Sequence, residues 1–225
     1  MTVRVMLISP AMNAALREAR FDGDAPLDRS GERQARAAAD AVPVASRALC
    51  GPSERCLGTA TALGLAARPE QALAGWNLGR WSGLRLDAVG AAEPAGVAAW
   101  LGDPSAAPHG GETLRALVER VGGWLEALDG DGPGGDGRHR PSGDDGPGAD
   151  GPSGAANGPP TARDRSVVAV VEPAIVRSAV VHALRLPVEV FWRLDVGPLV
   201  LTELSGRRER WNVRLGRPLT VPQDT

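Results

Sequence analysis

The sequence opens on Val3-Arg4-Val5-Met6-Leu7-Ile8, a short apolar run that is rich in β-branched residues and is followed by Ser9 and Pro10. A run of this length, ended by a turn signal, is typical of a strand that is buried on both faces of a sheet. Sheets of such strands are covered by helices on both sides. The opening stretch therefore indicates an α/β fold.

A second run of the same kind, residues 167–171, is followed by Glu172 and Pro173. Proline is favoured in the first turn of a helix, so we expect a helix from Pro173 to about Leu184. A strand, a sharp turn and a helix thus follow one another in the order of an α/β unit.

Strands and helices are predicted to alternate between these two runs. Cap-type residues from Asp28 precede an Ala-rich helix that reaches about Ala41. A short strand is expected at 48–51. Ser53 is then a plausible cap for a second helix, which ends near Leu63. Apolar positions at helical spacing from Leu114 to Leu128 predict a helix of about four turns. Residues 199–204 and 210–215 are expected to form a hairpin with its turn at Ser205-Gly206.

Residues 129–160 are almost entirely Gly, Pro, Asp, Ser and Ala, with no aliphatic side chain larger than alanine. Such a segment cannot bury enough apolar surface to offset the entropy lost on ordering. We expect a disordered insertion there, within a single domain formed by residues 1–128 and 161–225.

The composition restricts the classes of partner and the compartment. The net charge is −2, and we find no block of like charges that suggests a nucleic-acid or membrane-surface partner. No apolar stretch reaches the ~18 residues of a membrane span. Cys50 and Cys56 are expected to be buried thiols. We expect a cytoplasmic protein without metal or cofactor; the sequence predicts no oligomeric state.

Several segments, taken in chain order, resemble the histidine phosphatase superfamily, also called phosphoglycerate-mutase-like. The longest match is Asp24-Ala25-Pro26-Leu27-Asp28-Arg29-Ser30-Gly31-Glu32-Arg33-Gln34-Ala35, against the family pattern Asp-x-Pro-Leu-Thr-x-x-Gly-x-x-Gln-Ala. The other matching segments are residues 7–11, 20–21, 51–60, 79–83, 108–113 and 170–177. The resemblance implies a three-layer α/β sandwich whose central, mostly parallel sheet has helices on both faces.

The mismatches fall on the positions to which the resemblance assigns the chemistry. Pro10 stands where the family has its nucleophilic histidine, and proline offers no side-chain nitrogen or oxygen. Ser9 replaces the adjacent phosphate-binding arginine. Gly75 stands where a glutamate would protonate the leaving group. No histidine precedes His109, so a small shift of the alignment does not restore the nucleophile.

Glu172 stands at the position of the second catalytic histidine, where a carboxylate repels a phosphate group by roughly 1 kcal/mol or more per charge pair at 4 Å. If the family geometry holds, Glu172 can pair with Arg55, either as a structural ion pair or as part of a ligand site. Arg55 and Arg20 match anion-binding positions of the family.

Three functions remain open at this stage. The first is a pseudoenzyme that binds a small anion or a protein partner in the former active-site cleft. The second is an active phosphomonoesterase or mutase of the cobalamin-pathway or phosphoglycerate-mutase-like type. The third is a rewired enzyme that uses Ser9 and Glu172. Among the remaining candidates, His109 is expected to be an exposed loop residue, and Arg177 and His182 to support the fold.

We predict that deleting residues 129–160, and closing the gap with a short flexible linker, leaves the melting temperature nearly unchanged. Loop-closure entropy varies slowly with length, and the segment has no large apolar group to lose from a core. Denaturant unfolding of the deletion variant checks this, and a loss of several kcal/mol would mean that the segment packs on the domain.

Overall fold

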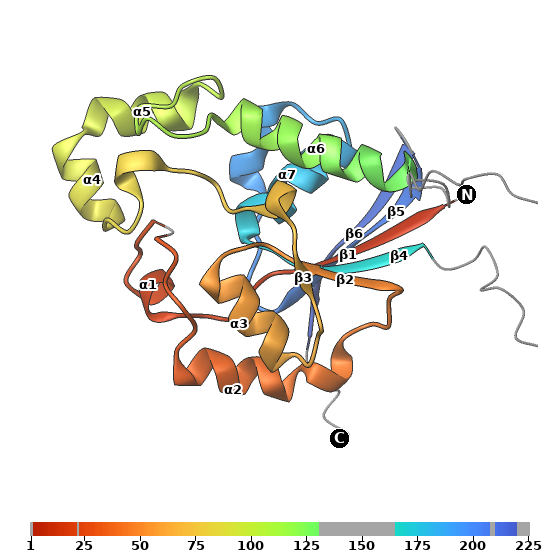
Figure 1. Ribbon diagram of the computed structural model, residues 1–225. Helices are drawn as coiled ribbons and strands as arrows, with labels where there is room; N and C mark the ends of the chain where they lie inside the picture. The colour runs from red at the N-terminus through yellow and green to blue at the C-terminus, as the bar shows by residue number, and fades with distance from the viewer. Residues whose placement is uncertain (1, 22, 131–164, 208–209, 220–225) are drawn as a thin grey trace, which may run out of the picture.

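The computed structural model describes residues 2–21, 23–130, 165–207 and 210–219 (Figure 1). The predicted insertion lies outside the described residues from position 131 onward. Its first two residues, 129 and 130, instead belong to α6 (Leu114–Gly130). The helix therefore runs two residues past the expected boundary, because each added residue extends an existing hydrogen-bonded turn at little cost.

A six-stranded mixed sheet forms the centre of the molecule. Its strands, in chain order, are β1 (Val3–Ile8), β2 (Arg47–Cys50), β3 (Arg68–Pro69), β4 (Ser166–Val170), β5 (Val200–Arg207) and β6 (Arg210–Pro218). They lie side by side in the order β3-β2-β4-β1-β5-β6. The first four strands in this order are parallel to one another. Strand β5 runs antiparallel to its neighbour β1, and β6 runs antiparallel to β5. The expectation of a mostly parallel sheet is confirmed.

Strand β1 lies inside the sheet and carries buried side chains on both faces. Val5 and Leu7 belong to one hydrophobic cluster, whereas Met6 and Ile8 belong to another. Successive side chains of a strand point to opposite faces, so the two clusters occupy the two sides of the sheet. The unbroken apolar run that opens the sequence is thus explained by burial on both sides.

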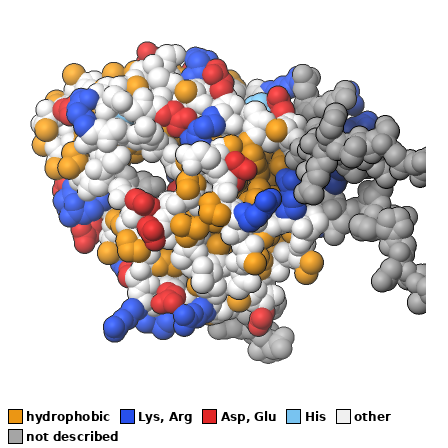
Figure 2. Space-filling model, viewed as in Figure 1, with side chains coloured by type: hydrophobic (Ala, Val, Ile, Leu, Met, Phe, Trp, Pro, Cys, Tyr) orange, Lys and Arg blue, Asp and Glu red, His pale blue; other side chains and the backbone are white. Residues whose placement is uncertain are grey.

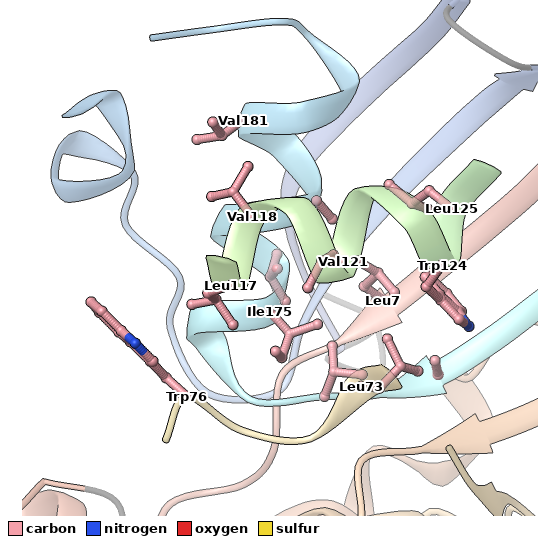
Figure 3. Packing of buried hydrophobic residues seen from close by; sticks show 14 of the residues in the cluster. Leu7, Leu73, Trp76, Leu117, Val118, Val121, Trp124, Leu125, Ile175 and Val181 are labelled. Atoms are coloured by element: carbon pink, nitrogen blue, oxygen red, sulfur yellow. The ribbon is translucent and has the colours of Figure 1, made fainter. Parts of the chain in front are cut away.

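Helices cover both faces and complete a three-layer sandwich (Figure 1). On one face lie α2 (Arg29–Ala37) and α3 (Glu54–Ala62). On the other lie α6 and α7 (Pro173–Ala183), whose side chains meet those of β1 in one cluster (Figure 3). The remaining short elements are α1 (Ala14–Arg17), α4 (Leu86–Ala92), α5 (Pro94–Gly102), and 3-10 turns at Ala39–Ala41, Gln71–Leu73, Gly79–Trp81 and Val188–Arg193.

The helix starts follow the predicted capping residues. The Asp28 side chain accepts a hydrogen bond from the Gly31 amide at 2.9 Å, and Ser53 accepts one from the Cys56 amide at 3.2 Å. Pro173 occupies the first turn of α7. These caps satisfy amides that have no partner within the helix.

The predicted turn of the C-terminal hairpin is wrong. Ser205 and Gly206 lie within β5, where Gly206 is paired with Trp211 of β6. A Cβ at Gly206 would overlap the carbonyl oxygen of Arg210. The glycine is therefore required by the close approach of two strands, not by a turn.

The visible surface carries charges of both signs close together (Figure 2). On that face, arginine and acidic side chains are interspersed, with apolar side chains between them. Among the helices that the structure describes, none combines the length and the apolar character needed to cross a membrane.

The contact between α6 and α7 depends on a glycine, and we predict that Gly122→Ala lowers the free energy of unfolding by about 1–3 kcal/mol. The added methyl group would overlap the ring of His182 on α7. Gly123→Ala is the matched control: its Cβ meets nothing within 4 Å, and helix propensity should raise stability by roughly 0.5–1 kcal/mol. Denaturant unfolding of both variants measures the difference, and equal stabilities would contradict the packing described.

Candidate functional site

Three loops meet at one edge of the sheet because β1, β2 and β4 are parallel. Ile8 and Cys50 are both in register with Val170, so the chain leaves the three strands at the same level. The amide of Gly51 donates to the Val170 carbonyl at 2.8 Å, and the amide of Val171 donates to the Ile8 carbonyl at 2.9 Å. In open α/β sheets, ligands bind outside the carboxyl ends of the strands.

A buried ion pair lies at this edge. Arg55 Nη1 is 3.2 Å from Glu172 Oε2, and their side chains are only 8% and 6% exposed. Both partners lie at the start of a helix: Arg55 is in the first turn of α3, and Glu172 directly precedes α7. The pairing expected from the sequence is present.

Further groups from α3 and the β1 loop hold the pair in place. The Ser53 hydroxyl donates to Glu172 Oε1 at 3.1 Å, and the Cys56 thiol lies 3.6 Å from the same oxygen. Arg55 Nε donates to the Ala11 carbonyl at 3.1 Å. Burial, and next the adjacent carboxylate of Glu172, raise the pKa of the Cys56 thiol well above its usual value. The thiol thus stays protonated and can donate to the carboxylate.

A pocket of about 170 Å³ opens beside this pair and brings three of the predicted candidates together, whereas Ser9, Pro10 and Gly75 do not line it. Its lining includes Arg20, Arg55 and Glu172. Arg20 is 38% exposed, pairs with Glu18 at 2.7 Å and donates to the Gly83 carbonyl at 3.2 Å. The site therefore combines one buried arginine, one partly exposed arginine and one buried carboxylate.

Comparison with known sequences identifies the family. Residues 11–136 match the sequence model described as the histidine phosphatase superfamily (branch 1). The chain belongs to this superfamily. A comparison with curated protein sequences gave no match.

Solved structures of similar fold align along almost the whole chain. A mycobacterial glucosyl-3-phosphoglycerate phosphatase is 24% identical, with a TM-score of 0.74 over 97% of this chain and 100% of its own. A protein described as mycobacterial hydrolase 1 is 25% identical, with a TM-score of 0.74 over 96% and 99% of the two chains. A putative α-ribazole-5'-P phosphatase from Escherichia coli is 16% identical, with a TM-score of 0.74 over 99% of each chain. These likenesses agree with the phosphoglycerate-mutase-like fold.

Ser9, which stands at the position of the superfamily's first arginine, has a structural role in this chain. Its buried hydroxyl donates to the Gly197 carbonyl at 2.5 Å and accepts from the Val200 amide at 3.0 Å. These bonds tie the end of β1 to the loop that enters β5. The structure therefore does not bring Ser9 and Glu172 together as a nucleophile and its base.

The other two altered positions, Pro10 and Gly75, themselves carry no reactive side chain. Pro10 is buried between Ser9 and Ala11, whose carbonyl holds Arg55. Gly75 lines a second hollow, of about 520 Å³, that shares Trp76 with the pocket at Arg55. Asp24 also lines that hollow, and its carboxylate accepts from the Glu54 amide at 2.7 Å.

The expectation that His109 is exposed is wrong: its side chain is 1% exposed. Nδ1 accepts from the Gly111 amide at 3.0 Å, and the ring packs edge-on against Trp81 and Trp76. Burial, and next the charge of Arg80, lower the pKa of His109. The sequence placed this residue in a loop but gave no sign that aromatic side chains from other segments cover that loop.

Arg177 and His182 lie away from the pocket, in agreement with the roles predicted for them. The Arg177 guanidinium stacks 5.6 Å from the Phe191 ring centre, and His182 Nε2 lies 3.2 Å from Glu126 Oε1. Neither residue lines the pocket at Arg55. Both therefore act in packing α7 against its neighbours.

Sequence reasoning missed Asn13 and Trp76 as residues of the site. Asn13 lines the pocket, caps α1 by accepting from the Leu16 amide at 3.0 Å, and donates to the Ala25 carbonyl at 2.9 Å. The signal for Asn13 was available, since asparagine before a short apolar segment is a cap residue. The wall formed by Trp76 depends on its indole donating to the Glu112 carbonyl at 2.8 Å, a contact that no local pattern indicates.

We predict that Arg55→Met lowers the free energy of unfolding by about 3–5 kcal/mol, because the change leaves the buried carboxylate of Glu172 without its countercharge. The double variant Arg55→Met/Glu172→Gln should recover much of this loss, since it removes both charges. Urea unfolding of the parent, the two single variants and the double variant gives the coupling between the two residues. Additive losses would mean that the pair does not contribute as a unit.

Proposed function

We propose that this superfamily member is inactive as a phosphatase and that its former active-site cleft binds a small anion. The proposal is carried by the Arg55–Glu172 ion pair, together with the proline at position 10. Covalent phosphoryl transfer requires a nucleophile, and proline provides none. The arginine that would hold a transferring phosphoryl group is already neutralised by a carboxylate at 3.2 Å.

Several features favour a small anion as the ligand. Two arginines line the pocket, Arg20 paired with Glu18 and Arg55 paired with Glu172, so an anion would be held by hydrogen bonds from the guanidinium groups rather than by an excess of positive charge. The mycobacterial glucosyl-3-phosphoglycerate phosphatase of the same fold has been solved with inorganic phosphate and with VO3. The volume of about 170 Å³ suits a small ligand better than a segment of a protein partner.

The two enzymatic alternatives have less support. An active phosphomonoesterase or mutase of the family type needs a histidine at position 10, which is proline. A rewired enzyme needs a free Ser9 hydroxyl, whereas that group is bonded to Gly197 and Val200. We also propose a cytoplasmic location, supported by Cys50 and Cys56, which are buried and unbridged.

We predict that the purified protein does not hydrolyse p-nitrophenyl phosphate, 3-phosphoglycerate or other simple phosphomonoesters above background. The reason is the combined loss of the nucleophile at Pro10, the proton donor at Gly75 and the second histidine at Glu172. A discontinuous phosphate-release assay tests it. Turnover on the order of 1 per second, or a trapped phosphohistidine, would overturn the proposal.

We predict that Glu172→Gln binds phosphate more tightly than the parent, by roughly five- to a hundredfold in Kd, because one repulsive charge is removed while the shape is kept. Arg55→Ala should weaken binding instead. Glu32→Gln is a control, since Glu32 pairs with Arg36 on the exposed side of α2.

Isothermal titration calorimetry with inorganic phosphate, below the melting temperature of each variant, measures these affinities. Equal phosphate affinity in the parent and in Glu172→Gln would show that Glu172 does not act on the ligand. Activity should not return in any of the variants, because Pro10 is unchanged.

A further inference from the structure

The two edges of the central sheet differ in length and in chemistry. At one edge, β3 has only two residues, Arg68 and Pro69, and proline has no amide to donate. At the other edge, β6 has nine residues, and in the described part of the chain it pairs with β5 alone. Alternate residues of β6 therefore direct backbone N–H and C=O groups outward, where a further strand can pair with them.

The side chains of β6 alternate between two environments. Trp211 and Val213 pack in the hydrophobic cluster that includes residues of α6 and α7. Arg210, Asn212 and Arg214 project from the opposite face, because successive side chains of a strand point to opposite faces. All three are exposed. A strand added beside β6 would thus meet an apolar side and an arginine side.

The arginine side carries more positive than negative charge. Arg207 of β5 lies directly opposite Arg210, and neither has an ion pair in the described part of the chain. Like charges directly opposite each other destabilise a strand pair. Glu203 on the same side is shared, at 2.6 Å with Arg4 and at 3.6 Å with Arg214. Carboxylates of a partner can therefore contact Arg207 and Arg210 without displacing an existing ion pair.

The side that faces α7 has two adjoining hollows, of about 480 and 450 Å³, which share Trp211. The smaller one is lined by residues 210–212 of β6 and by Leu184, which is 43% exposed. The lining of the larger one includes Leu186 and Val188. These hollows offer room for the apolar side chains of a strand that lies beside β6.

We propose that the open edge of β6 binds an extended acidic segment of a partner protein as an additional strand. Alternate side chains of such a segment point to opposite faces, so its acidic side chains lie against Arg207 and Arg210 while its apolar side chains enter the hollows beside α7. Backbone hydrogen bonds to β6 supply affinity, and the alternation of acidic and apolar residues supplies specificity.

A second copy of this chain fits the edge less well than an acidic partner. The pairing of β6 with β5 is regular from Arg210 to Arg214, and arginine stands at both ends of this stretch. Antiparallel pairing of the stretch with its own copy would set arginine opposite arginine. Such like-charge pairs are destabilising, whereas glutamate or aspartate at these positions would be attracted.

This surface lies at the opposite end of the sheet from the pocket at Arg55. Gly206 of β5 is in register with Val3 at the start of β1 and with Trp211 on β6. The pocket at Arg55 instead lies beyond Ile8, where β1 ends. The inference therefore goes beyond the proposed function and does not depend on it.

Labelled peptides test the surface on the full-length chain by fluorescence anisotropy. The probes are a short peptide of alternating glutamate and valine, one of alternating lysine and valine, and one in which the same glutamates and valines form two separate blocks. The alternating glutamate–valine peptide should bind most tightly, by about tenfold or more over each of the others. N-methylation of its backbone amides should abolish binding, because the strand pairing is then lost.

Two variants and an exchange measurement locate the binding. Arg210→Glu should weaken binding of the glutamate–valine peptide by about tenfold or more at physiological ionic strength. Arg68→Glu, the same change at the exposed opposite edge of the sheet, should leave it unchanged. Hydrogen–deuterium exchange of residues 210–218 should become slower when the peptide is bound. Thermal unfolding verifies that both variants are folded at the titration temperature.

Several results would overturn the proposal. They are failure of the glutamate–valine peptide to bind, equal affinity of the parent and Arg210→Glu, and binding that leaves the exchange of residues 210–218 unchanged. Slower exchange of these amides at higher protein concentration, without peptide, would assign the edge to a second copy and also overturn it. None of these results bears on phosphate binding or hydrolysis at the pocket, so the proposed function stands or falls separately.

Discussion

The architecture of the site depends on two opposite charges that are held together away from water. Arg55 and Glu172 come from segments far apart in the sequence and meet where β2 and β4 end, each almost fully buried. Removing water from either charge alone would cost several kcal/mol, and mutual pairing with added hydrogen bonds offsets that cost. Ser53, Cys56 and the Ala11 carbonyl supply those additional partners. The pair consequently joins the loops after β1, β2 and β4 into one unit.

A second network fixes the wall that faces this unit. Arg120 of α6 makes a bidentate ion pair with Glu112, both bonds at 2.9 Å, and donates to the Ala72 and Ala74 carbonyls at 2.8 and 3.1 Å. The Glu112 carbonyl in turn accepts from the Trp76 indole. A fork-shaped guanidinium is suited to this task because it binds a carboxylate and carbonyls at once. Arg120, on the long helix α6, thus fixes the position of Trp76 in the pocket by holding Glu112 and the segment that precedes Gly75.

These two networks explain how the superfamily fold is held together with proline at position 10 and glutamate at position 172. The sheet, the helix caps and the pocket depend on burial and hydrogen bonding, none of which requires a histidine at position 10. What the pocket attracts depends instead on the charge and volume left at its lining, where Glu172 faces Arg55 and apolar side chains form the walls. A scaffold and its chemistry can therefore change independently.

The sequence by itself determined the α/β class, the buried strands, the capped helices and the absence of a nucleophile at Pro10. Apolar periodicity, capping and the chemistry of a side chain are properties of short segments, so they can be predicted locally. Only the tertiary structure decided that His109 is buried, that Ser9 is bonded to the loop before β5, and that Gly206 lies in a strand. Each of these outcomes is fixed by groups distant in the chain or across a strand pair, whose approach depends on how the whole sheet and its covering helices pack.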